Sequence, residues 1–341
     1  MWEVLLAACL ISDPTDCATE RRPGGETYNA CVVAAEAMTV AEGRAKQAWP
    51  CVAEGETPDM ALTEVAPGVL VHKAVHGLIG PENGGDIANI AAVVGEDAVA
   101  VIDAGSTAGV AGRFLAALGA HTDKPMDWLI LTHMHPDHTL GAGVFRDAGA
   151  TVVAHANLPR ALSARARSYL DAGARALGAE MDGAAAVMPD ATVADRRVID
   201  LGGRRLLLEA HPVGHTDNDL TVTDDATEVL FAGDLVFLGH LPTLDGSLRG
   251  WLGVLDDLTA RHASRVVMGH GPAAAPWPEA AAPTRAYLEG LAEAARAAIA
   301  AGEPILAATR AMARDVPPGW ALADRFAERN ATAAFRELEW E

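Results

Sequence analysis

The residues with the clearest chemistry lie in one short run, Thr132–His138, which follows the apolar stretch Trp128–Leu131. Imidazole and carboxylate groups are suitable ligands for a borderline divalent ion such as zinc. A regular helix or strand cannot point several neighbouring side chains at one centre, but a turn from strand to helix can divide them between two adjacent ions. A histidine-rich loop that binds nothing is the alternative. The side chains of this run that could bind metal are His133, His135, Asp137 and His138.

Three further apolar runs lead to residues of the same chemical types. The strand ends on one edge of an open α/β sheet are where such folds place their sites. Glycines beside two of these residues, Gly233 and Gly269, let the backbone turn sharply where a ligand must point inward. We therefore expect all these side chains to meet at one metal centre. The runs and their residues are Leu206–Ala210 before His215, Val229–Ala232 before Asp234, and Val266–Met268 before His270.

From Leu62 onward, short apolar strands alternate with helical stretches, which predicts an α/β layered architecture. We predict helices around Ala108–Leu118, Asn157–Leu177 and Pro276–Ala301, and a strand at Thr151–Ala154. The arginines of the second helix are expected on its solvated side; they are Arg160, Arg165, Arg167 and Arg175.

Composition narrows the range of partners. Half of the 341 residues are apolar and the net charge is −20, so the chain is globular. The charge argues against nucleic acid, because phosphate binding needs a basic groove. No apolar run approaches the length of a membrane-spanning helix, so we expect no membrane insertion. The expected partner is a small-molecule substrate.

All four cysteines lie in the first 51 residues, at Cys9, Cys17, Cys31 and Cys51. An even number in one segment predicts two disulfides, whose pairing the sequence leaves open among three connectivities. A second zinc site and free buried thiols are the alternatives. Disulfides imply an oxidising compartment, in a Gram-negative bacterium the periplasm. The apolar stretch near Met1 lacks the basic residues of a secretion signal, so a periplasmic location needs an upstream leader, and the protein is cytoplasmic otherwise.

These patterns predict three parts of the chain. Residues 1–57 are expected to form a cysteine-containing cap with a helix around Thr27–Gln47. Residues 58–310 are expected to form the layered domain that carries the metal ligands. Residues 311–341 are expected to form a helical C-terminal tail.

The order HxHxDH, HT, GD and GHG, at residues 133–138, 215–216, 233–234 and 269–271, resembles the metallo-β-lactamase superfamily. The resemblance implies a four-layer αββα sandwich with a dinuclear zinc centre. One ion would be held by His133, His135 and His215, and the second by Asp137, His138 and His270. Asp234 would bridge the two ions. Aspartate at the bridging position resembles the glyoxalase II branch more than zinc β-lactamases, so β-lactam hydrolysis is the less expected native activity.

A narrower resemblance is to the quinoprotein relay system zinc metallohydrolases. It implies a link to periplasmic oxidation systems that use pyrroloquinoline quinone, with a quinoprotein dehydrogenase as partner and a substrate that is not defined. Besides the N-terminal cysteines, the blocks that carry it are Pro81–Asn89, His155–Arg160, His215–Leu220 and Leu244–Trp251.

The expected reaction is hydrolysis of an ester-, thioester- or amide-like bond. Zinc lowers the pKa of bound water to about 7, and paired ions can hold attacking and leaving oxygens together. Asp137 is the expected catalytic residue, which orients this water and passes its proton on. Asp103 is expected to accept a hydrogen bond from a ligand histidine. The alternatives are an iron-dependent redox enzyme of the same fold, similar to persulfide dioxygenases, and a non-catalytic metal-binding accessory factor.

Other polar and aromatic residues allow two interpretations each. His155, His211 and His240 fit either the mouth of the site or a structural role, and Trp251 fits either substrate contact or helix packing. The loop around Asn83–Asn89 fits either a cover over the site or a plain turn.

Overall fold

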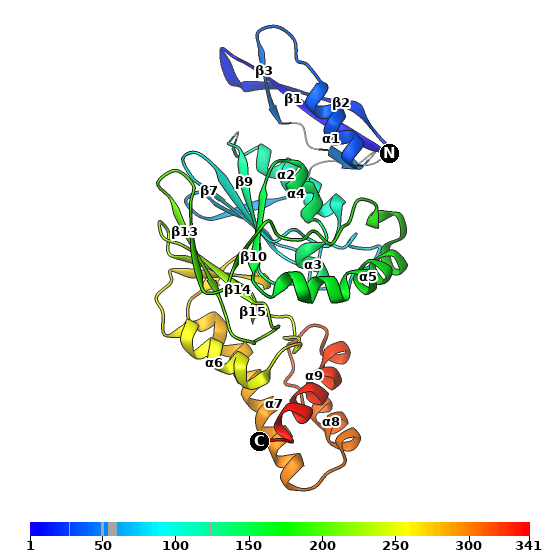
Figure 1. Cartoon of the computed structure of the whole chain (residues 1–341), viewed down its shortest axis with the longest axis vertical. Coiled ribbons are helices and arrows are strands. Elements are labelled where there is room, and N and C mark those ends of the chain that lie inside the picture. Colours follow the sequence, from blue (N-terminus) through cyan, green and yellow to red (C-terminus); the bar gives the residue numbers. More distant parts are fainter. Residues whose placement is uncertain (27, 49–50, 54–59, 123) are drawn as a thin grey trace.

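The computed structural model describes residues 1–26, 28–48, 51–53, 60–122 and 124–341. Figure 1 shows the N-terminal elements at one end of the long axis, the two large sheets in the middle and the C-terminal helices at the other end.

The N-terminal segment forms a small antiparallel sheet with one helix. The predicted helix around Thr27–Gln47 is wrong beyond Ala37, and Thr27 itself lies outside the described residues. Gly43, with a left-handed φ of 80°, turns the chain so that Arg44 pairs with Leu10 in the sheet instead of extending the helix. The elements are β1 (Trp2–Leu10), β2 (Asp13–Gly25), α1 (Tyr28–Ala37), β3 (Arg44–Ala48) and β4 (Cys51–Ala53).

Two cysteines of this segment, Cys9 and Cys31, are buried, and each takes part in a disulfide bond. The side chains of Cys17 and Cys51 lie outside what the structure describes, so the pairing of the two predicted disulfides, which the sequence leaves open, stays open.

The first large sheet has seven strands, and its central part carries the histidine run. Neighbouring strands are antiparallel from β5 to β8 and parallel from β8 to β11. The parallel half therefore brings the carboxyl ends of four consecutive strands, β8 to β11, to one edge. In spatial order the strands are β11 (Ala191–Val193), β10 (Thr151–His155), β9 (Met126–Leu131), β8 (Val99–Ile102), β7 (Ile90–Val94), β6 (Val69–His72) and β5 (Leu62–Ala66).

The second large sheet has six strands and contributes the outlying ligands. It is antiparallel apart from the parallel pair of β15 with β16. In spatial order its strands are β12 (Arg196–Asp200), β13 (Arg205–Ala210), β14 (Leu220–Asp224), β15 (Val229–Phe237), β16 (Arg265–His270) and β17 (Ala275–Pro276).

Alternate side chains along each strand point to opposite faces of the sheet, and both faces are buried. In the first sheet Ile130 belongs to the core between the sheets, whereas its neighbour Leu129 packs with Phe114 beneath the helices. Phe231 and Leu208 of the second sheet complete the core between the sheets. This alternation with period two is what buries both faces of each sheet.

Helices cover the outer face of each large sheet, which confirms the four-layer αββα sandwich (Figure 1). The predicted helix from Pro276 begins later, at Ala282, because Ala275–Pro276 joins the second sheet as β17. The helices on the first sheet are α2 (Ala108–Gly119), α3 (Pro136–Thr139), α4 (Ala142–Asp147) and α5 (Leu158–Leu177); the later helices are α6 (Leu248–Thr259), α7 (Ala282–Ala300), α8 (Ile305–Arg314) and α9 (Ala323–Leu338). Short 3₁₀ turns occupy Gly178–Met181 and Glu279–Ala281.

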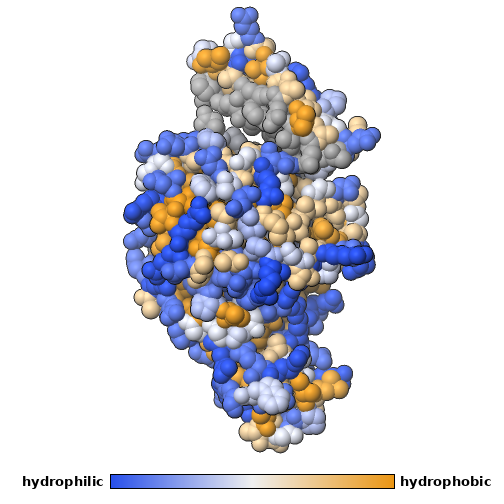
Figure 2. All heavy atoms as spheres, viewed as in Figure 1, coloured by the Kyte–Doolittle hydropathy of each residue, from blue (hydrophilic) through white to orange (hydrophobic). Residues whose placement is uncertain are grey.

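The surface of the large sheets and their helices is mixed. Figure 2 shows a face on which hydrophobic residues form small groups among hydrophilic ones. Among the described residues, no helix has the length and apolar character needed to cross a membrane.

Candidate metal centre

The histidine run lies where β9 ends and the short helix α3 begins. Burial of Leu129–Leu131 fixes the strand, and Pro136 at the first turn starts the helix directly after His135. His133 and His135 therefore project from the turn, while Asp137 and His138 project from the helix. This change of backbone direction divides the four side chains between two groups.

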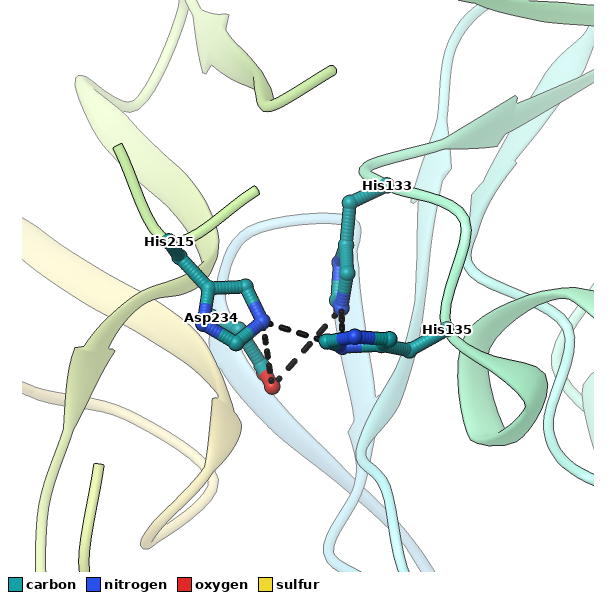
Figure 3. A group of neighbouring side chains, drawn as sticks. All are labelled: His133, His135, His215 and Asp234. Carbon is teal, nitrogen blue, oxygen red and sulfur yellow. Dashed lines mark hydrogen bonds and ion pairs between the residues drawn. The ribbon is translucent and has the colours of Figure 1, made fainter. Parts of the chain in front are cut away.

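The first group contains three histidines and one aspartate, drawn in Figure 3. His135 Nδ1 lies 3.0 Å from both His133 Nε2 and His215 Nε2. Asp234 Oδ2 lies 3.8 Å from His133 Nε2 and 3.6 Å from His215 Nε2. These four donor atoms, from three separate segments, point at one another and all lie within 4.8 Å.

The second group contains Asp137, His138 and His270, and Asp234 adjoins it as well. His270 Nε2 lies 3.2 Å from Asp137 Oδ2 and 3.4 Å from Asp234 Oδ2. His138 Nε2 lies 3.4 Å from Asp234 Oδ1. Asp234 thus has a carboxylate oxygen close to histidines of both groups, which agrees with the bridging role predicted for it from the sequence.

The donor atoms fit a cation better than they fit one another. His138 Nε2 and Asp234 Oδ1 are buried and have no hydrogen-bond partner among the described residues. Buried polar atoms are normally paired, so such atoms call for another partner. Imidazole nitrogens and carboxylate oxygens are the ligand types of zinc. The structure thus brings together all seven residues that the sequence predicted, in two groups that could each hold a metal ion.

Burial and charge make the two groups electrostatically different. Burial lowers the pKa of His215 to about 3 and that of His133 well below its usual value, so both rings are neutral. Burial acts in the same direction on His138, but the carboxylates of Asp234 and its neighbours outweigh it and raise the pKa of His138 to about 9. The same carboxylates raise the pKa of His270. The shared carboxylate therefore attracts positive charge into the second group.

Four of the five ligand histidines have a hydrogen bond on the far side of the ring; His270 Nδ1 has no such partner among the described residues. His138 Nδ1 donates to Asp103 Oδ2 over 2.8 Å, as predicted. The same oxygen accepts from the Thr132 hydroxyl at 2.9 Å, and that hydroxyl lies 3.1 Å from His133 Nδ1. Asp103 has a left-handed φ of 63°, a conformation that aspartate tolerates better than most residues. One buried carboxylate thus orients ligands of both groups.

The other two histidines of the first group rely on one loop. His215 Nδ1 donates to the carbonyl oxygen of Thr243 at 2.7 Å, and His135 Nε2 donates to Asp245 Oδ2 at 3.0 Å. Asp245 also accepts from Arg165 of α5 and Arg329 of α9. Arg165 is partly exposed, as its predicted place on the solvated side of α5 requires, but its side chain also reaches across to the loop.

Close backbone approach explains two glycines. A Cβ atom on Gly269 would lie 2.1 Å from Asp234 Oδ1, and one on Gly233, where φ is 51°, would lie 2.7 Å from Thr132 Oγ1. The strand β15 does not end at Asp234 as predicted but continues to Phe237, with its pairing to β16 interrupted on both sides of Gly233. Asp234 therefore points inward from an irregularity within the strand.

The interpretation of Trp251 resolves toward packing, and one end of the Asn83–Asn89 loop has a structural contact. Trp251 is fully buried, donates to the carbonyl oxygen of Leu235 at 2.9 Å and lies against the His215 ring. Asn89 donates to the carbonyl oxygen of Met268 at 2.9 Å and accepts from the backbone of Ala74. The end of the Asn83–Asn89 loop thus secures the strand that carries His270.

Three further histidines lie near or behind the site. His240 stacks on His270 with ring centroids 4.7 Å apart. Its Nδ1 donates to the carbonyl oxygen of Leu241. His155 is buried at the end of β10. His211 is buried directly after β13 of the second sheet and forms a hydrogen bond with the Thr221 hydroxyl at 2.7 Å. The stacking makes His240 a neighbour of the second group, whereas His211 has a structural partner.

The sequence did not predict the hydrogen-bonded cluster beside His135 that consists of Asp245, Arg165 and Arg329. No motif links them, because they lie 80 or more positions apart. The one available signal is Asp245 itself, which belongs to the block Leu244–Trp251 that carried the narrower resemblance.

A sequence model of the metallo-beta-lactamase superfamily matches residues 83–270, more than half of the chain. The chain therefore belongs to this superfamily, whose members bind metal, often zinc, and are mostly hydrolases. No curated protein matches the chain.

Solved structures share the fold at low sequence identity. A metallo-beta-lactamase from Pontibacter korlensis is 22% identical with a TM-score of 0.54, over 67% of this chain and 98% of its own. The sec-alkylsulfatase Pisa1 from Pseudomonas sp. is 17% identical with a TM-score of 0.61, over 83% of this chain and 51% of its own. The metallo-beta-lactamase FIM-1 from Pseudomonas aeruginosa, in its mono-zinc form, is 20% identical with a TM-score of 0.52, over 67% of this chain and 94% of its own. These likenesses show the fold; the narrower resemblance to the quinoprotein relay group stays a prediction.

Proposed function

We propose that this protein is a zinc-dependent hydrolase with a dinuclear centre. The observation that supports this most directly is the pair of donor groups that share Asp234. His133, His135 and His215 would hold one ion, Asp137, His138 and His270 would hold the second, and Asp234 would join them. When bound, paired zinc ions supply Lewis acidity and a water acidic enough to attack at neutral pH.

The protein's own residues define where the substrate approaches. The side chains of His135 and Asp137 are each 15% exposed, whereas that of Asp234 is 3% exposed. The site therefore opens on the side of His135 and Asp137. An ester-, thioester- or amide-like carbonyl would enter there, with water excluded from the buried side.

Asp137 is the residue we assign to proton transfer. Burial tends to raise its pKa, but the positive charges of His138 and His270 outweigh this and hold the pKa of Asp137 well below its usual range. Its carboxylate is thus ionised, partly exposed and next to the reacting position. These properties suit a group that orients the attacking water through Oδ2 and passes its proton toward solvent.

We also propose an oxidising location and a link to a quinoprotein oxidation system. The disulfide-bonded Cys9 and Cys31 support an oxidising compartment such as the periplasm. The partner, a quinoprotein dehydrogenase, is supported only by the sequence blocks named above. Co-purification with such a dehydrogenase from periplasmic extract would test it, and recovery of the protein from the cytoplasm with reduced cysteines would contradict the location.

The first experiment is elemental analysis of protein purified without added metal. We expect about two zinc ions per chain, and a clear loss in His135→Ala. His262→Ala is the matched control, because His262 is exposed and pairs only with Glu228 among the described residues, so its metal content should equal that of the wild type. Predominant iron would favour the redox alternative, and absence of metal from all three proteins would contradict the proposed centre.

The second experiment tests turnover. The zinc-loaded protein should hydrolyse at least one member of a panel of thioesters, lactones, carboxylic esters and lactams, with sulfate esters added because one fold relative is an alkylsulfatase. Asp137→Asn should reduce the rate about 100-fold or more, the usual contribution of a positioned acid or base. A metal-loaded protein without turnover on any of these substrates would favour the accessory-factor alternative.

A further inference from the structure

The loop Leu241–Ser247 supplies the outer hydrogen-bond acceptors for two of the three histidines in the first group. Thr243 accepts from His215 through its carbonyl oxygen, and Asp245 accepts from His135 through its carboxylate. Such acceptors set which ring nitrogen carries the proton and therefore which one can bind metal. The position of this loop thus determines how well the first group is arranged.

The C-terminal helix α9 holds this loop from behind. Asn330, which is fully buried, accepts from the backbone N–H of Leu244 at 2.9 Å and donates to the carbonyl oxygen of Pro242 at 2.7 Å. Its amide also donates to the Tyr287 hydroxyl at 2.9 Å, which ties the contact to α7. The two backbone contacts lie on either side of Thr243.

The neighbouring residue of α9 holds the loop's side chain. Arg329 Nη2 donates to Asp245 Oδ1 at 3.1 Å, on the opposite oxygen from the one that accepts from His135. About two helical turns further on, Glu337 accepts from the backbone N–H of Leu248 at 2.7 Å and from the Ser247 hydroxyl at 2.8 Å. Two places on α9 therefore hold the loop, one at Pro242–Asp245 and the other at its end, Ser247.

The second group does not depend on this loop in the same way. His138 is oriented by Asp103, which lies in the other half of the sandwich. The nearest contact of His270 toward α9 is ring stacking on His240, whose ring lies 5.7 Å from that of Phe326. Neither Arg329 nor Asn330 takes part in that stacking.

We infer that α9 is a structural part of the metal centre, in which Asn330 and Arg329 are positioning residues for the first group. They act through Thr243 and Asp245 on His215 and His135, and not on the substrate. The C-terminal tail accordingly not only covers the second sheet but is also required to orient the histidines of the first group. This inference rests on the proposed dinuclear centre.

Cobalt and zinc titrations of the full-length protein test the inference. The protein is first stripped of metal and is then reconstituted in competition with a chelator. His215→Ala and His270→Ala provide reference cobalt spectra in which the first or the second group is disrupted. Asn330→Ala should weaken binding at the first group by about 10–100-fold, the usual effect of losing an outer hydrogen-bond partner, with the second group unchanged. Arg329→Met should weaken the same group by about 10-fold.

The controls separate positioning from folding. Arg329 is half-exposed and faces a groove of about 540 Å³, so Arg329→Met should fold even if Asn330→Ala does not. Arg329→Lys should restore binding, because a single N–H contact needs one cation and not a fork. Arg336→Met is the matched control on the same helix; Arg336 is exposed and forms no ion pair with the loop among the described residues.

The outcomes are distinguishable from those of the proposed function. A wild type that binds no metal contradicts the dinuclear centre. A wild type that binds two ions together with an Arg329→Met variant of unchanged affinity contradicts the role of α9. Equal weakening of both groups, or failure of Arg329→Lys to restore the first, also contradicts it.

Discussion

Replacing Asp103 with asparagine should impair the second metal group without disturbing the backbone. Asp103 Oδ1 accepts from the backbone N–H of Thr132 at 2.8 Å, and its Oδ2 accepts from the Thr132 hydroxyl and from His138 Nδ1. Asparagine tolerates the left-handed backbone at this position, so the change tests the hydrogen bonds alone. An amide keeps one acceptor oxygen, which we expect to remain on the backbone N–H.

The amide NH₂ then faces His138 Nδ1, where a carboxylate oxygen stood. Two donors cannot face each other, so His138 should move its proton to Nε2, which is the nitrogen that points at Asp234. That nitrogen can no longer bind metal without a further proton shift. Changes of this kind typically reduce metal affinity by about 10–100-fold, or roughly 1.4–2.8 kcal/mol at 1.4 kcal/mol per tenfold.

Chelator competition on metal-stripped protein measures this loss directly. Asp103→Asn should bind the second zinc 10–100-fold more weakly, while Asp97→Asn, an exposed change of the same kind, should match the wild type. Melting of both variants in excess chelator shows whether the fold is retained. A folded Asp103→Asn protein that binds both ions within about twofold of the wild type would refute the argument that Asp103 fixes the His138 tautomer.

Two further predictions concern packing and pH. Gly269→Ala places a methyl group 2.1 Å from Asp234 Oδ1, so it should lower metal content and cost about 1–3 kcal/mol of unfolding free energy. Gly253→Ala, a helical position with open space around its Cβ, should be neutral or stabilising, and equal effects in the two variants would contradict the steric argument. Burial, together with the nearby Arg261 and His155, lowers the pKa of His211 from 6.5 to about 4. The neutral His211 ring therefore adds to the free energy of unfolding above pH 6.5, and this stabilisation is lost as the pH falls toward 4. In chelator, urea unfolding at pH 7.5 and 4.5 should show a loss about 2.5 kcal/mol larger for the wild type than for His211→Gln, and identical losses would show that His211 is not held neutral.

Four of the seven proposed ligands could be predicted because their signal is local: His133, His135, Asp137 and His138 lie in six residues at one strand end. The other three each follow a separate apolar run, and they could be expected at the same centre because such folds place their sites at strand ends. The alternation of strands and helices predicted an α/β layered architecture, and the resemblance to the metallo-β-lactamase superfamily implied the αββα sandwich. Asp103 could be predicted as an outer acceptor because it, too, follows a strand on that edge.

The remaining features depend on contacts between distant segments. Helical periodicity identified an arginine-rich face on α5, but it could not show that the loop carrying Asp245 lies within reach of Arg165. In the same way, Gly233 indicated the end of a strand, whereas the apolar residues after Asp234 continue β15 in the packed sheet. The tail illustrates the limit most clearly, since its sequence predicts a helix but not a partner. Only the fold reveals that Asn330 meets the loop beside His215 and His135, so truncations chosen from the sequence boundary at residue 311 would remove part of the site's support.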